Sequence, residues 1–222
     1  MNESYLRQSL AELIGTFILV FVGAAAVTIA GSSGGVAVAA LAHGLVLVAI
    51  IAMYGHISGA HVNPAVTAGL LVGGKIEFQK ALYYWVAQFA GGIIAAFVLV
   101  ALIPEGSNFG QATGSLTDNA VWSAAVFEAI MTFFLVSTVF QAAAYGKSGN
   151  VAGIAIGFTL AASILAGGVY TGASLNPART LGPALAAGNF DYLVPYLIGM
   201  FVGGIVAGLL HSQVFQPTTD ES

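Results

Sequence analysis

The stretch SGAHVNPAVT at residues 58–67 recurs as TGASLNPART at residues 171–180, and this pair of stretches decides the fold. The offset between them is 113 positions, from 58 to 171. A shorter pair, E-x3-T-F at residues 12–17 and again at residues 128–133, precedes each long stretch in the same order. The order indicates two similar halves, which we place at about 5–103 and about 120–215. Both belong to one predicted domain that covers residues 1–222.

The composition excludes a protein that is surrounded by water. Charged residues make up 6% of the chain and apolar residues 58%, with a mean hydropathy of +0.93. A soluble domain has about 25% charged residues, and one of this size could not hide so much apolar surface. The net charge of −4 argues against a nucleic-acid partner, which selects basic patches. The chain has no cysteine, so disulfides and thiolate metal sites are excluded.

Six apolar stretches have the length that a bilayer-spanning helix needs, about 20 residues. We predict spans at residues 10–30, 36–54, 81–103, 120–144, 151–170 and 192–210. The alternating pattern of a membrane β-barrel does not occur, so the predicted fold class is all-α. Each half holds three spans, an odd number, and the second half must therefore insert upside down relative to the first. The sequence thus predicts an inverted 3+3 repeat.

Basic residues predict which side of the membrane each loop faces. Four of them precede the first predicted span or lie in the second and fourth loops: Arg7, Lys75, Lys80 and Lys147. Lys and Arg favour the cytoplasmic side, so both termini, including the tail at 216–222, are expected there. We expect a multi-pass integral protein of the cell membrane. Arg179 is the one basic residue on the outer side, and it calls for a separate explanation.

The repeated stretches are too short to cross a bilayer. The segments 62–72 and 175–187 each follow a predicted span, and each contains Asn-Pro-Ala. Asn is a favoured N-cap residue, and Pro is favoured at the first helical position. We therefore predict two re-entrant half-helices with Asn63 and Asn176 as their N-caps. In an inverted repeat they would enter from opposite faces, and their N-termini would meet near the middle of the membrane.

Such an arrangement favours the passage of small neutral molecules. Irregular backbone at membrane depth is tolerated where it lines a water-filled cavity. The lead-ins to the half-helices would offer carbonyl oxygens to that cavity, from Gly59, Ala60, His61, Gly172, Ala173 and Ser174. Each half-helix N-terminus brings about half a positive charge to the centre. The centre would therefore repel cations, hydronium included, and admit neutral solutes in single file.

These features resemble the aquaporin family, also called the major intrinsic proteins. The resemblance covers nearly the whole chain. It rests on two Asn-Pro-Ala motifs within six spans, on Arg179 directly after the second motif, and on a buried acid in each half. The motif residues are Asn63, Pro64, Ala65, Asn176, Pro177 and Ala178. The resemblance implies an hourglass pore, a homotetramer with one pore per subunit, and a passive channel rather than an enzyme. It implies no cofactor and no metal.

The resemblance also implies a four-residue selectivity filter near the outer mouth. Spacing from the motifs matches it to His43, Ile164, Ala173 and Arg179. At 1.5 Å per residue, His43 lies about 10 Å and Ile164 about 9 Å below the outer surface. The set is similar to that of plant tonoplast intrinsic proteins, which implies water and ammonia as permeants and, in some members, urea. Fast glycerol passage is not expected, because the residue after Arg179 is Thr180 and not Asp.

Two buried acids leave an alternative open. Glu12 and Glu128 occupy equivalent places in the halves, and the resemblance implies that they brace the lead-ins by accepting backbone hydrogen bonds. A secondary transporter with inverted repeats is the alternative, and it would use these two acids for proton coupling. Aromatic residues near the ends of spans are expected at the membrane interface: Tyr83, Tyr84, Trp85, Trp122 and Tyr192.

Overall fold

The computed structural model of the chain describes residues 3–103 and 108–217. Within these residues, six helices are long and apolar enough to cross a membrane, and they confirm the predicted number of spans. The six spans are Ser4–Ile29, Gly35–Ser58, Phe78–Leu102, Val121–Ala144, Gly149–Thr171 and Leu193–Gln213. Residues 1–2 and parts of the predicted third loop and tail, 104–107 and 218–222, lie outside the described residues.

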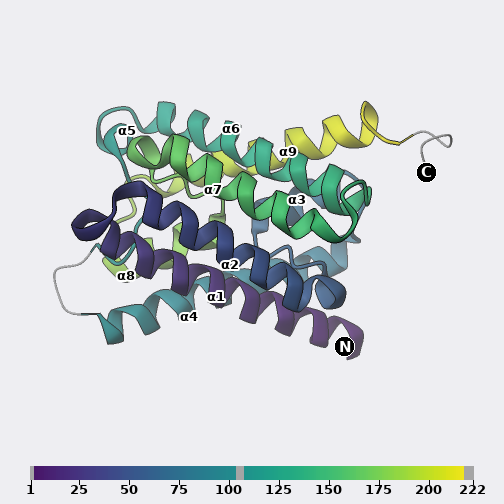
Figure 1. Ribbon diagram of the computed structural model, residues 1–222, viewed down its shortest axis with the longest axis horizontal. Helices are drawn as coiled ribbons and strands as arrows, with labels where there is room; N and C mark the ends of the chain where they lie inside the picture. The colour runs from purple at the N-terminus through teal and green to yellow at the C-terminus, as the bar shows by residue number, and fades with distance from the viewer. Residues whose placement is uncertain (1–2, 104–107, 218–222) are drawn as a thin grey trace.

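The spanning helices form an inverted repeat of packing partners. In the first half, α1 (Glu3–Ser33) packs against both α2 (Gly35–Ser58) and α4 (Phe78–Leu102). In the second half, α6 (Val121–Val139) packs in the same way against α7 (Ala152–Thr171) and α9 (Leu193–Gln213). The start of α1 and the end of α9 lie at the same end of the bundle (Figure 1).

The first span starts earlier than predicted. It was expected to begin at residue 10, but α1 begins at Glu3 and continues through Ser33, across most of the loop expected at 31–35. Polar residues at 4 and 7–9 do not stop a helix, because its backbone hydrogen bonds are internal and its side chains can reach the membrane surface. Hydropathy thus marks the part of a helix that lies in hydrocarbon, and not the whole helix.

Two short helices enter the bundle from opposite ends. They are α3 (Pro64–Val72) and α8 (Pro177–Ala187), which lie toward opposite ends of the long axis (Figure 1). Each begins two residues later than the segments predicted at 62–72 and 175–187, and each ends where predicted. α3 packs against α9 and α4, and α8 packs against α4 and α9, so both are covered by spanning helices.

Glycines let helices of the second half approach closely. A methyl group at Gly199 of α9 would collide with the carbonyl oxygen of Ala125 on α6. One turn further, Gly203 stands in the same relation to the carbonyl of Ala129. Small residues at helix contacts are the usual means of close packing in membranes. The Gly-x-x-x-Gly spacing in α9 therefore has a structural explanation.

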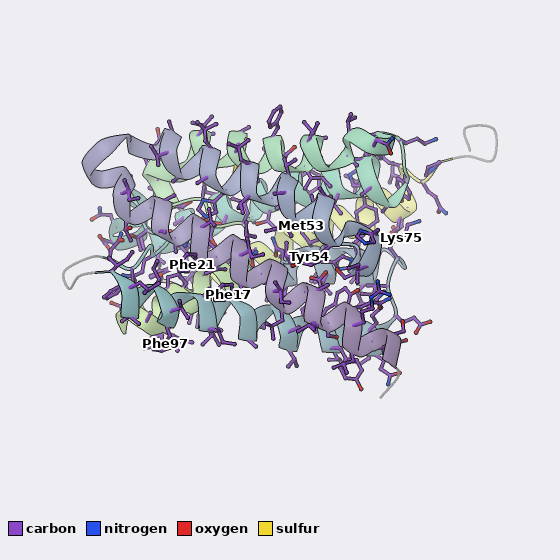
Figure 2. The ribbon with its side chains drawn as sticks, turned by 60° about the horizontal axis from the view of Figure 1, so that its bottom comes forward. Phe17, Phe21, Met53, Tyr54, Lys75 and Phe97 are labelled. Atoms are coloured by element: carbon purple, nitrogen blue, oxygen red, sulfur yellow. The ribbon has the colours of Figure 1, made fainter. Side chains whose placement is uncertain are left out.

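Shorter elements connect the spans. A short helix, α5 (Ser115–Asn119), lies inside the loop predicted at 104–119. A π-helical turn, η1 (Phe140–Ala144), ends the fourth span, and a 3-10 turn, η2 (Gly149–Val151), begins the fifth. The outer surface of the bundle is apolar, as lipid contact requires. Phe97, for example, points away from the bundle and is 52% exposed (Figure 2).

Candidate pore and selectivity site

The two lead-in segments follow the same unusual backbone path. α2 and α7 both end at a glycine in the left-handed conformation, Gly59 with φ 91° and Gly172 with φ 80°. In each lead-in the next residue and the one before Asn also have positive φ: Ala60, Val62, Ala173 and Leu175. Non-glycine residues rarely adopt this conformation, at a cost of roughly 1–3 kcal/mol each. Such a backbone needs support from its surroundings.

Glu12 supplies that support in the first half. Its Oε1 accepts from the Ser58 hydroxyl at 2.7 Å and from the His61 backbone N–H at 2.9 Å. Its Oε2 accepts from the Val62 N–H at 2.6 Å and from the Gln88 side-chain amide at 2.8 Å. The side chain is fully buried, so these four donors replace the water that a carboxylate would otherwise bind.

Glu128 does the same in the second half with three donors. Oε1 accepts from the Thr171 hydroxyl at 2.7 Å and from the Ser174 N–H at 2.9 Å, and Oε2 accepts from the Leu175 N–H at 2.8 Å. No counterpart of Gln88 donates to it within the described residues. Each acid thus accepts from the two backbone N–H groups that directly precede the Asn of its half-helix. Apart from Gln88, the donors to both carboxylates lie in the lead-ins or at the last residue of the preceding helix.

The Asn side chains join the two half-helices at the centre. The Oδ1 of Asn63 accepts from the Ala65 N–H at 2.9 Å, and its Nδ2 donates across the interface to the Leu175 carbonyl at 2.8 Å. Asn176 repeats the pattern: its Oδ1 caps α8 at the Ala178 N–H, 3.0 Å away, and its Nδ2 donates to the Val62 carbonyl at 2.9 Å. Both asparagines are N-caps, as predicted, and Pro64 and Pro177 are the first helical residues.

A small cavity lies beside the two asparagines. It measures about 20 Å³, which is room for about one water molecule. Asn63, Asn176, His43, Ser174 and Arg179 give it polar lining groups. Four leucines form much of the rest, one from each of α1, α2, α6 and α7, and the repeat relates them in pairs: Leu19 with Leu135, and Leu47 with Leu160. The cavity thus has polar groups and a symmetric apolar wall.

A second, larger cavity adjoins the first lead-in. Its volume is about 480 Å³, and its lining includes Gly59, Ala60 and His61. It reaches Lys75 in the loop after α3, and Lys75 lies at the end of the molecule where α1 begins (Figure 2). The Lys75 ammonium lies 4.6 Å from the ring centre of Tyr145, in cation–π contact.

Two of the four predicted filter residues are in contact. The Nε of Arg179 donates to Nε2 of His43 at 3.4 Å, while Nδ1 of His43 lies 2.8 Å from the Ala39 carbonyl. A neutral imidazole with its proton on Nδ1 satisfies both contacts. The terminal nitrogens Nη1 and Nη2 of Arg179 are buried and have no hydrogen-bond partner among the described residues. They therefore remain as donors beside the small cavity.

The other two predicted filter residues are buried and do not border the small cavity. Ile164 and Ala173 are each 2% exposed and belong to the same apolar cluster as the four leucines. Of the predicted carbonyl set, Gly59, Ala60 and His61 border the larger cavity and Ser174 borders the smaller one. Gly172 and Ala173 border neither of the two.

The interface prediction is wrong for Tyr84 and Tyr192. Their side chains are 0% and 1% exposed. The Tyr84 hydroxyl donates to the Ser58 carbonyl at 2.6 Å, so this ring supports the first lead-in. Trp85 is half-buried and donates to the Pro64 carbonyl at 3.0 Å, and Trp122 is 61% exposed. A buried Tyr needs a partner for its hydroxyl, and lead-in carbonyls supply one.

Sequence reasoning missed several residues that hold the lead-ins. Gln88 bridges Glu12 and Thr67, whose hydroxyl lies 3.1 Å from Nδ1 of His61. On the other side, the Tyr196 hydroxyl donates to the Thr171 carbonyl at 3.0 Å. Gln88 is not repeated, since Met200 stands at the equivalent place in the second half, whereas Tyr196 repeats Tyr84 and Thr67 repeats Thr180. A polar residue within an apolar span was the available signal, and Gln88 shows it most clearly.

Comparison with known proteins places this geometry in a family. A family model described as major intrinsic protein matches residues 1–211. Aquaporin TIP1-1 of Zea mays is 42% identical to this chain over 97% of the chain and 90% of that protein. Probable aquaporin TIP2-1 of Oryza sativa subsp. japonica is 39% identical to this chain over 99% of the chain and 94% of that protein. The X-ray structure of the aquaglyceroporin from Plasmodium falciparum superposes with a TM-score of 0.82 at 26% identity, covering 98% of this chain and all of that one.

Proposed function

Because the chain belongs to the major intrinsic protein family, we propose that it is a passive channel for water that also conducts ammonia and excludes protons and other ions. The observation that carries the proposal is the pair of half-helices whose N-caps meet at the centre of the bundle: the Asn63 amide donates to the Leu175 carbonyl, and the Asn176 amide donates to the Val62 carbonyl. No covalent step is needed, so the proposal is a channel and not an enzyme.

The centre favours neutral molecules for electrostatic reasons. Each side-chain amide has two N–H groups. The crossed bonds use one from Asn63 and one from Asn176, so the second of each can donate to a water molecule in the cavity. The N-termini of α3 and α8 add about half a positive charge each. A water that accepts from both amides cannot pass a proton through the centre, and a cation is repelled there.

The outer constriction supports water and ammonia as permeants. Two unpartnered guanidinium nitrogens of Arg179 can donate to water, and Ile164 and Ala173 add no polar group. A site of this composition should accept a small neutral solute with little preference for hydroxyl groups. Urea and glycerol are the alternative permeants. The similarity to a protein named as an aquaglyceroporin is the reason to test glycerol directly.

A secondary transporter is the alternative from another class. It would need acids that are free to bind and release protons during transport. Glu12 accepts four hydrogen bonds and Glu128 three, and neither borders the two cavities described above. This engagement supports the bracing role and a channel without proton coupling.

The remaining proposals concern the setting of the channel. We infer a homotetramer in the lipid bilayer of the cell membrane, with both termini in the cytoplasm. The shared end of α1 and α9 and the placement of Lys75 at that end support the predicted topology (Figure 2). Protease cleavage of a terminal tag in sealed, oriented vesicles tests the topology, and the mass of the purified detergent complex tests the assembly.

The central test is solute flux through the purified protein in liposomes. Stopped-flow light scattering measures volume change in gradients of sorbitol, urea or glycerol, and an internal pH dye measures ammonia and proton entry. We expect fast water and ammonia flux, slow glycerol flux and no proton leak. Replacing Arg179 with Val should raise urea and glycerol flux at least threefold. Water flux no faster than in empty liposomes would refute the proposed function.

A further inference from the structure

We propose that Gly23 of α1 sets the aperture of the filter by forming the wall behind His43. This inference rests on the proposed function, since it concerns the same constriction. Gly23 does not border the small cavity, and the sequence motifs do not point to it. It is a positioning residue, which acts through the imidazole ring of His43.

The evidence is that the His43 ring packs directly against the backbone of α1 at Gly23, with no space for a methyl group between them. A methyl group built on Gly23 would lie 2.5 Å from Cδ2 and 2.7 Å from Cε1 of His43, and closer still to Nε2. The three atoms nearest to such a methyl all belong to the His43 ring. Glycine in the middle of a helix is less favourable than alanine. Its presence is explained if the ring must rest against the α1 backbone.

The ring cannot move aside easily, because both of its nitrogens are engaged. Nδ1 lies 2.8 Å from the Ala39 carbonyl on the same helix, and Nε2 accepts from Arg179 at 3.4 Å. The edge of the ring that faces Gly23 includes Nε2, the atom that accepts from Arg179, and His43 is one of the residues that line the small cavity. Pressure from the α1 side therefore moves the ring toward the cavity and toward Arg179.

The inverted repeat supplies an internal comparison. Gly23 and His43 lie one turn beyond the cavity residues Leu19 and Leu47 on α1 and α2. The offsets that relate the halves match this pair to Val139 and Ile156, which line the larger cavity. The second half thus has two branched aliphatic residues where the first half has glycine and histidine. Full-sized side chains fit at this position of the fold, and the glycine is specific to the imidazole.

The size of the effect follows from the contact distances. Moving Cδ2 from 2.5 Å to an ordinary contact of 3.4 Å requires the ring to shift by about 1 Å. The cavity holds about 20 Å³, so a shift of this size would remove much of the space for one water molecule. We expect Gly23→Ala to lower water flux at least fivefold and to reduce urea flux to the level of empty liposomes.

The test is a double-mutant cycle in liposomes with Gly23→Ala, His43→Ala and the double variant, using water, ammonia and urea as probes. If the methyl acts through the ring, the double variant conducts within twofold of His43→Ala alone. Gly168→Ala is the matched control. Its methyl would lie 2.6 Å from Cγ1 of Val36, away from the small cavity, and its flux should stay within twofold of the unmodified channel.

The outcomes separate this inference from the proposed function. Unchanged flux in Gly23→Ala, or a double variant that stays blocked, overturns the role of Gly23 while the channel itself stands. If Gly23→Ala does not fold, the double variant decides, because removal of the ring removes the collision. A double variant that also fails to fold, while His43→Ala folds, overturns the inference. An unmodified channel that conducts no water overturns both proposals.

Discussion

Replacing Glu128 with Gln should destabilise the protein strongly, although the two side chains have nearly the same shape. The carboxylate accepts from the Thr171 hydroxyl and the Ser174 N–H through Oε1, and from the Leu175 N–H through Oε2. A glutamine can keep its carbonyl oxygen at the first position. Its NH2 group then faces the Leu175 N–H, and two donors oppose each other at about 2.8 Å.

The expected loss in the free energy of unfolding is the sum of two contributions. A buried backbone N–H without an acceptor costs about 1–3 kcal/mol. The two surviving hydrogen bonds change from charged to neutral acceptors, which weakens each by about 1 kcal/mol. The sum is roughly 3–5 kcal/mol, or a fall of about 10 °C in Tm for a chain of this size. The lead-in at Ser174 should also become mobile, so water flux should fall.

Thermal unfolding in detergent, followed by size-exclusion chromatography of the heated samples, measures the shift. Thr132→Val is the matched control, since Thr132 lies one turn along α6, is fully buried, and its hydroxyl has no partner among the described residues. We expect this control to stay within about 2 °C of the unmodified protein, as isosteric loss of an unpaired hydroxyl is nearly neutral. A Gln variant that melts together with this control would refute the argument that charge braces the lead-in.

Three further predictions concern the charge at the centre of the pore, the hydrogen bonds that support the second lead-in, and the response to mercury. Asn63→Asp removes the donor to the Leu175 carbonyl and adds a negative charge at the centre, so proton leak through liposomes should rise at least tenfold; an unchanged leak would contradict the electrostatic barrier. Tyr196→Phe removes the bonds to the Thr171 carbonyl and the Thr117 hydroxyl, and we expect a loss of about 1–3 kcal/mol, measured as a lower Tm, with equal melting as the contrary result. Mercuric chloride should leave water flux unchanged, since the chain has no cysteine; strong inhibition would mean that another group in the pore binds mercury.

The fold was predictable because its decisive feature is local and occurs twice. An Asn that caps a helix and a Pro at the first helical position fix where α3 and α8 begin, and the structure places both residues in these roles. The ends of long spans were less accurate, as α1 shows, because hydropathy does not mark where a helix leaves the hydrocarbon. The short helix α5 was not predicted, since its five residues have no apolar period.

The site was predictable where residues repeat and unpredictable where they act through packing. Glu12 and Glu128 are isolated acids in apolar spans, so their need for partners could be inferred from the chain alone. The partner hydroxyl of Ser58 and the buried ring of Tyr84 depend on which face of a helix turns inward, and nearly uniform apolar helices do not reveal that face. Gly23 could not be identified from the sequence, because its proposed contribution is that it has no side chain where the His43 ring packs.

The crossed bonds between Asn63 and the Leu175 carbonyl also bear on how the chain is made. The two partners are 112 positions apart, so at about 5–20 residues per second the ribosome needs roughly 6–22 s between them. Until the second half is made, the Asn63 amide lacks the Leu175 carbonyl as its acceptor. Nascent chains stalled between the halves should therefore show an open, protease-sensitive first lead-in. A first half made alone could complete these hydrogen bonds only with a second copy inserted in the opposite orientation.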